Sequence, residues 1–200
     1  MTGLRAIRLV TWAAIAVLVI AVGVVAFQWQ KGGGNIAAAV IGGPFQLTDQ
    51  HGATVTDASL RGHPSAMFFG YTFCPDVCPT TLSDLTLLME KLGPAADRLK
   101  VYFVTVDPER DTQQQLADYL QAFDPRFSGL TGTREAIDQM LKEYRVYSKK
   151  VPGEDGSSYT MDHTAAVYLL DKDGRLSGTL DYHEADETAL AKLKRLIDGA

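Results

Sequence analysis

The stretch AMFFGY, residues 66–71, is a short and nearly continuous apolar run, which is typical of a strand buried at the centre of a parallel sheet. It is followed closely by FCPDVCP, residues 73–79, which contains both cysteines of the chain. A helix is predicted over 79–92, because apolar residues recur there every three or four positions. The run VYFVTV, residues 101–106, predicts a second buried strand, so this region indicates an α/β domain.

The segments around this centre continue the alternation of strands and helices. Two short segments, 45–48 and 54–56, flank a Gln-His-Gly turn and predict a β-hairpin. Further along the chain we expect helices at about 112–122 and 133–144, strands at 165–170 and 175–180, and a final helix with Leu190, Leu193 and Ile197 on one face. This order fits a thioredoxin-like central sheet with an extra N-terminal β-hairpin.

Length and composition narrow the classes of protein that fit. Two hundred residues suit one domain of ordinary size with a modest appendage. With 46% hydrophobic and 22% charged residues, the chain is neither collagen-like nor wholly disordered. The net charge of −5 argues against nucleic acid as a partner, because a nucleic-acid binder needs a basic surface to neutralise phosphates.

The N-terminus has the properties of a membrane anchor. Residues 9–27 are almost entirely apolar, and no charge occurs between Arg8 and Lys31. At a rise of ~1.5 Å per residue, this stretch spans ~28 Å, about the thickness of a bilayer core. The alternative is a cleaved signal peptide, but such a segment is shorter and ends at a small-x-small site. We therefore predict an uncleaved transmembrane helix over 9–30.

The flanking charges predict how this helix is oriented. Arg5 and Arg8 precede it and Lys31 alone follows it, so the positive-inside rule keeps residues 1–8 in the cytoplasm. The N-terminus is unlike an organellar transit peptide, which favours a bacterial inner membrane. The glycine-rich segment 31–41 is expected to be a flexible tether, and 42–200 a thioredoxin-like domain in the periplasm.

The two cysteines lie where the first central strand meets the first helix. Because proline suits the first helical position, Pro79 predicts that Cys78 is the N-cap and that Cys74 lies in the loop above it. A thiolate there gains from the helix dipole and from unpaired backbone amides. Two sulfurs four positions apart can close a structural disulfide or hold one ion. A ring that short stabilises a fold only weakly, so we favour a chemical role.

A metal site would need a further ligand, and the chain has four histidines. His51, His63 and His183 fall in predicted turns and strand ends, where a solvated surface position is the default. His163 precedes the strand at 165–170, and in a thioredoxin-like topology it could approach Cys74 and Cys78. A satisfied structural histidine is the equal alternative. Met161 would share its face, but a core or rim methionine is the simpler reading.

The donor types favour a particular metal. Two thiolates and one imidazole form a soft three-coordinate set that suits Cu(I) and can still hold Cu(II). A structural zinc site would normally recruit a fourth protein ligand, and the chain has no third cysteine. Copper is therefore the expected ion, with an affinity that falls at acid pH because the ligands must lose protons.

With these residues in hand, the chain resembles the Sco/SenC family of copper-binding assembly proteins for cytochrome c oxidase. The matching segments are YTFCPDVCP (71–79), VDPERDT (106–112) and DHT (162–164), within a resemblance that covers about residues 42–198. It implies a thioredoxin-like fold and copper bound by Cys74, Cys78 and His163. It also implies delivery of copper, or reduction of cysteines, at the dinuclear copper centre of oxidase subunit II.

The polar run at 107–111 follows the second predicted strand. Asp107 could act just outside the metal ligands, whereas Glu109, Arg110 and Asp111 are expected to build a turn and cap the next helix.

The main alternative function is a thiol-disulfide oxidoreductase that reduces the cysteines of an exported target, and a peroxiredoxin-type peroxidase ranks last. Other copper chaperones or thioredoxin-like reductants are further expected partners, and the chain is expected to act as a copper chaperone rather than primarily as an enzyme.

Overall fold

The computed structural model describes residues 41–154, 156 and 158–199, together with the single positions Trp12, Leu18 and Gly23. The chain divides into two compact units, Met1–Ala39 and Val40–Ala200. Apart from those three positions and Ile41, the predicted transmembrane helix (9–30) and tether (31–41) lie outside the described residues. Within the described part, no helix is both long and apolar enough to cross a membrane.

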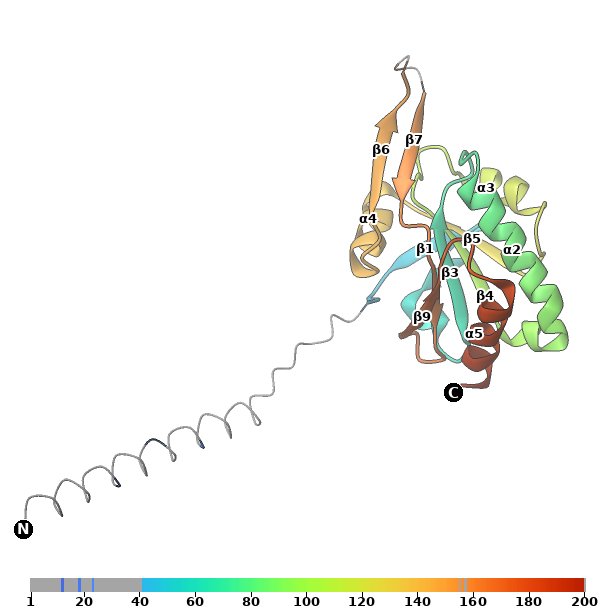
Figure 1. Ribbon diagram of the computed structural model, residues 1–200. Helices are drawn as coiled ribbons and strands as arrows, with labels where there is room; N and C mark the ends of the chain where they lie inside the picture. Colours follow the sequence, from blue (N-terminus) through green and yellow to red (C-terminus); the bar gives the residue numbers. More distant parts are fainter. Residues whose placement is uncertain are drawn as a thin grey trace, which may run out of the picture. The chain divides into compact units, whose positions relative to one another are not determined.

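A seven-stranded mixed sheet forms the centre of the second unit, in the order β2-β1-β5-β4-β3-β8-β9 (Figure 1). The strands β3, β4 and β5 run parallel, and the remaining pairings are antiparallel. All six residues of β3 are buried, as its apolar sequence predicted. The strands are β1 (Gln46–Asp49), β2 (Thr54–Thr56), β3 (Ser65–Gly70), β4 (Lys100–Thr105), β5 (Phe127–Thr131), β8 (Val167–Leu170) and β9 (Leu176–Leu180).

Helices and two short 3-10 turns pack around the sheet. Helices α2 and α5 lie against each other, α3 lies against β5, and α4 lies beside β1. The apolar stripe predicted for the first helix is buried, at Leu82, Leu85, Met89 and Leu92. The elements are α2 (Val77–Leu92), α3 (Gln113–Leu120), α4 (Arg134–Glu143), α5 (Asp186–Asp198), η1 (Asp57–Leu60) and η2 (Gly93–Arg98). The mixed sheet and its helices confirm the thioredoxin-like α/β fold, and β1 and β2 form the predicted N-terminal hairpin.

Two strands form a separate sheet that projects from the domain (Figure 1). They are β6 (Ser148–Pro152) and β7 (Tyr159–His163), paired antiparallel so that Ser148 lies opposite His163. This β6–β7 hairpin was not predicted, and neither was β5. The position of β7 matters most for function, because it ends at the candidate ligand His163.

The start of α2 differs from the prediction. The helix begins at Val77 with Asp76 as its N-cap, so Cys78 is the second helical residue and the prediction that it is the N-cap is wrong. The amide of Thr80 donates the first helical bond to the carbonyl of Asp76 at 3.1 Å. Pro79 is the third helical residue, and it is tolerated in the first turn because the first amides of a helix have no intrahelical partner in any case.

Candidate metal centre

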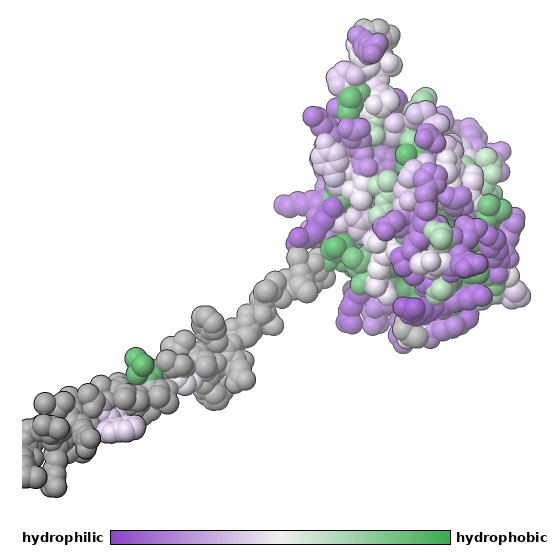
Figure 2. Space-filling model, viewed as in Figure 1, coloured by the Kyte–Doolittle hydropathy of each residue, from purple (hydrophilic) through white to green (hydrophobic). Residues whose placement is uncertain are grey.

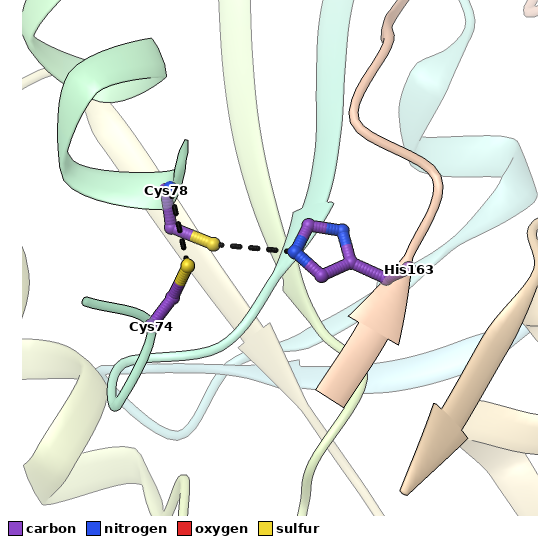
Figure 3. Close-up of side chains that lie close together, drawn as sticks. All are labelled: Cys74, Cys78 and His163. Carbon is purple, nitrogen blue, oxygen red and sulfur yellow. Dashed lines mark hydrogen bonds between the residues drawn. The ribbon is translucent and has the colours of Figure 1, made fainter. Parts of the chain in front are cut away.

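Two sulfurs and one imidazole meet where the cysteine loop faces the end of β7. The donor atoms of Cys74, Cys78 and His163 all lie within 4.8 Å of one another (Figure 3). Cys74 comes from the loop after β3, Cys78 from the first turn of α2, and His163 from the last residue of β7. The fold thus brings together residues that are 85 positions apart in the sequence.

The imidazole of His163 is oriented with one nitrogen towards the sulfurs. Its Nδ1 donates to the carbonyl of Thr164 at 3.0 Å, and its Nε2 lies 3.5 Å from the Sγ of Cys78. With the proton on Nδ1, the lone pair of the neutral ring is on Nε2. A backbone carbonyl that fixes the second ring nitrogen is the usual arrangement of a metal-binding histidine.

The two cysteines differ sharply in environment. The hydrogen bond from the thiol of Cys78 lowers the pKa of Cys74 to about 3, and the backbone amides of Asp76 and Cys78 add to this effect. The amide of Cys78 donates to the Sγ of Cys74 at 3.4 Å, so the sulfur of Cys74 caps the start of α2. The same pairing, together with burial, raises the pKa of Cys78 well above its ordinary value. The result is a half-buried thiolate beside a buried thiol, and both cysteines are free.

The space for the Cys78 sulfur depends on Gly70, the last residue of β3. A Cβ at this position would lie 2.7 Å from the Sγ of Cys78 and 2.7 Å from the Cε2 of Phe103. Cys78 itself is completely buried. The glycine therefore provides the space that the inner sulfur occupies.

The centre is open to solvent on its outer side. A pocket of about 310 Å³ is lined by Cys74 and His163 together with Tyr71, Val77 and Met161. Met161 is 9% exposed and belongs to the hydrophobic core, in line with the simpler reading of its role. The visible face of the domain is otherwise largely hydrophilic, with apolar residues in small separate areas (Figure 2).

The other histidines do not belong to this cluster. His51, His63 and His183 are exposed, as predicted. Among the described residues, the cluster that could hold an ion consists of Cys74, Cys78 and His163.

Comparison with known proteins agrees with this geometry. A family model described as SCO1/SenC matches residues 34–198. The chain belongs to the SCO1/SenC family. It is 41% identical over 136 residues to an SCO2-like protein of Rickettsia prowazekii, covering 68% of this chain and 66% of that one. It is 39% identical over 150 residues to the human mitochondrial SCO1 homologue, covering 74% of this chain and 49% of that one.

A solved structure extends the comparison to three dimensions. The copper-bound structure of Bradyrhizobium japonicum ScoI is 51% identical to this chain and superimposes with a TM-score of 0.73, covering 78% of this chain and 99% of that one. The chain therefore shares the fold of a SCO1/SenC protein that holds copper, while spanning only half to two thirds of the two sequence relatives.

In this SCO1/SenC chain, Asp107 is buried beside Arg110 and Tyr159. Its side chain is 1% exposed and accepts hydrogen bonds from the Nε of Arg110 at 2.5 Å and from the hydroxyl of Tyr159 at 3.1 Å. Its carbonyl also accepts from the amides of Arg110 and Asp111, so the expected turn is present. Asp107 thus holds Arg110 and Tyr159, and neither of these residues supplies a donor atom.

Asp111 has a role that the sequence analysis did not anticipate. Its buried carboxylate accepts from the amide and hydroxyl of Thr72, at 3.0 and 2.7 Å, and from the hydroxyl of Thr105 at 2.7 Å. The N-cap of α3 is Thr112, whose hydroxyl accepts from the amide of Gln115. The expectation that Asp111 caps the helix is wrong, because its side chain instead ties the cysteine loop to β4.

Proposed function

We propose that this SCO1/SenC protein is a membrane-anchored copper metallochaperone that binds one copper ion through Cys74, Cys78 and His163. The observation that carries the proposal is the convergence of three soft donors within 4.8 Å. Donors bound to one ion at about 2.0–2.3 Å lie up to about 4.6 Å apart, so small side-chain movements suffice to close the site. Copper in the 51% identical relative supports the same use of these donors.

The donor set also favours copper over other ions. Thiolate and imidazole donors suit Cu(I), and the same three groups can retain Cu(II). Because Cys74 is held as a thiolate by its hydrogen bonds, one ligand is ready for the ion before binding. The pocket over Cys74 and His163 gives a recipient access to the cargo.

Family membership and the N-terminal sequence support a destination for the copper. We place the receiving centre in subunit II of cytochrome c oxidase, with other copper chaperones or thioredoxin-like reductants as further partners. The charge pattern supports residues 1–8 in the cytoplasm, a helix over 9–30 in the bacterial inner membrane, a tether over 31–41 and a periplasmic domain over 42–200.

Copper titration of the detergent-solubilised chain tests the proposal. The wild type should bind one Cu(I) per chain, and Cu(II) should give thiolate charge-transfer absorption. His163→Ala should bind copper at least tenfold more weakly, whereas the matched control His183→Ala, at an exposed histidine, should bind like the wild type. Wild-type binding by the His163 variant would refute the three-donor site.

The unequal thiol pair also favours a second function, reduction of a target disulfide before copper is delivered. The Cys74 thiolate would attack one sulfur of the target and release the other as a thiolate. Cys78, after losing its proton, would then attack Cys74, which frees the reduced target and leaves a Cys74–Cys78 disulfide. A rate of insulin-disulfide reduction no faster than that of free dithiothreitol would count against this activity.

A further inference from the structure

We propose that Arg110 is a positioning residue that holds the β6–β7 hairpin against the cysteine loop and so sets His163 at the distance required for copper. The inference rests on the proposed function. Arg110 lies in the loop between β4 and α3, and its side chain contacts both of the segments that supply the donors. It touches none of the three donor atoms itself.

On one side, Arg110 binds the strand that carries His163. Its Nη1 donates to the carbonyl of Tyr159 at 3.1 Å, and its guanidinium lies 3.7 Å from the centre of the Tyr159 ring. The hydroxyl of Tyr159 donates in turn to Asp107, which also accepts from the Nε of Arg110. The start of β7 is therefore held by a stacked ring and a closed set of hydrogen bonds.

On the other side, Arg110 packs on the cysteine loop. Its guanidinium lies 4.8 Å from the ring of Phe73 and 5.6 Å from that of Tyr71. Phe73 immediately precedes Cys74 and is 52% exposed, and the guanidinium of Arg110 packs against its ring. Tyr71 also meets the imidazole of His163 edge-on, with ring centres 5.9 Å apart.

The architecture explains why such a link is needed. The β6–β7 hairpin forms a sheet of its own, so the ladder bonds of the large sheet do not fix its position. The cysteine loop, by contrast, is tied to the large sheet through Asp111 and Thr72. Met161 packs β7 on the core, and side chains that bridge the hairpin and the cysteine loop, Arg110 foremost, add to the position of the imidazole relative to the sulfurs.

The chemistry of the bridge calls for a guanidinium. A planar group can stack on rings while its edge donates hydrogen bonds in two directions, which the ammonium of lysine cannot do. Within the described residues, the Nη2 of Arg110 is buried without a hydrogen-bond partner. Leaving a buried donor unpaired costs free energy, so the stacking and the two bonded nitrogens must offset that cost.

A double-mutant cycle tests the inference. Arg110→Met and Arg110→Lys are each made in the full wild-type chain and in the His163→Ala chain, and copper affinity is measured by competition with a chelator. In the wild-type background both should weaken binding about tenfold, as is usual when a group that orients a ligand is lost. In the His163→Ala background they should change affinity less than twofold, because the donor that Arg110 positions is already gone.

The control is Arg126→Met, which removes a partly buried arginine that is paired with Asp124 and Asp97. It should leave copper affinity unchanged. Cu(II) charge-transfer spectra of the Arg110 variants should shift towards that of His163→Ala, which a loss of stability alone would not produce. Should Arg110→Met not fold, Arg110→Lys and Tyr159→Phe complete the cycle.

Two results would overturn the inference. One is wild-type affinity in both Arg110 variants, and the other is an equal loss in the two backgrounds. Failure of the proposed function looks different, because the wild-type chain would then bind no copper or His163→Ala would bind as tightly as the wild type.

Discussion

Replacing Gly70 by alanine tests whether copper affinity depends on the position of the Cys78 sulfur or only on the stability of the fold. The new Cβ would lie 2.7 Å from the Sγ of Cys78 and from the Cε2 of Phe103. Non-bonded contacts of carbon settle at about 3.5–4.0 Å, so the sulfur or the strand must retreat by roughly 1 Å. Metal donors tolerate errors of only about 0.2 Å. We therefore expect copper affinity to fall about 10- to 100-fold, or about 1.4–2.8 kcal/mol.

The matched control is Gly129→Ala in β5. Its Cβ would lie 2.8 Å from the Cδ1 of Leu120 and 3.2 Å from the Cβ of Leu116, so it overcrowds the core without touching the cysteines. Each variant should lose about 1–3 kcal/mol of unfolding free energy, as overpacked cores do. The assays are urea unfolding of the apo-proteins and chelator competition for Cu(I).

A copper affinity that follows stability alone would contradict this prediction. If Gly70→Ala bound copper like the wild type, the position of the Cys78 sulfur in the copper site would not depend on the space beside Gly70. If Gly129→Ala lost as much affinity as Gly70→Ala, general destabilisation would explain both variants.

Three further predictions follow from the ionised groups. Because the pKa of Cys74 is about 3 and that of Cys78 is raised, Cu(I) binding should release one thiol proton, and affinity should rise about tenfold per pH unit between pH 7 and 9; a hundredfold rise per unit would show two protonated thiols. Alkylation of Cys74 by iodoacetamide should change little between pH 5 and 8, where an ordinary thiol would gain roughly a thousandfold in rate; peptide mass spectrometry resolves the site. The hydrogen bonds from Arg126 lower the pKa of Asp124, so the pair stabilises the fold above about pH 3.8, and this contribution is lost as the pH falls through the lowered pKa. Asp124→Asn should therefore cost about 1–2 kcal/mol at pH 7 and progressively less below pH 4, and a cost independent of pH in urea unfolding would contradict this.

The strands and helices with strong periodic signals were predictable. The runs at 66–71 and 101–106 are almost entirely apolar, and both coincide with buried strands of the large sheet. The strand β5 was missed because Ser128 and Gly129 interrupt its apolar character, and its place comes from pairing with β4 and β1. The strand β6 contains Lys149, Lys150 and Pro152, a composition that does not indicate a strand without its partner β7.

The cysteine pair of the candidate site could be predicted more directly than its histidine. The cysteine pair was evident from its position after a central strand, whereas His163 needed the topology of the fold, since spacing does not link residues 85 positions apart. The start of α2 was predicted two residues too late. Pro79 was expected at the first helical position, and it is the third helical residue instead. Asp76 takes the N-cap position that was expected for Cys78, and the sulfur of Cys74 accepts a hydrogen bond from the amide of Cys78.

The surroundings of the site were beyond sequence reasoning. In the run DPERD, the acidic residues and the arginine all suit a solvated turn, and no periodicity separates them. Burial decides their roles, because Asp107 and Asp111 are almost fully enclosed whereas Glu109 pairs with Lys150 at the surface. Only the packed structure shows which carboxylates face inward.

The separate attachment of the β6–β7 hairpin has a consequence for unloading. Both sulfurs are anchored beside the main core, while the imidazole sits on an arm that joins β8 through residues 164–166. Withdrawing that arm would break one coordination bond together with the contacts of Tyr159 with Arg110 and Asp107, while both sulfurs would stay in place. A recipient thiol could then take the vacated position, so handover would begin as the exchange of a nitrogen donor for an incoming sulfur.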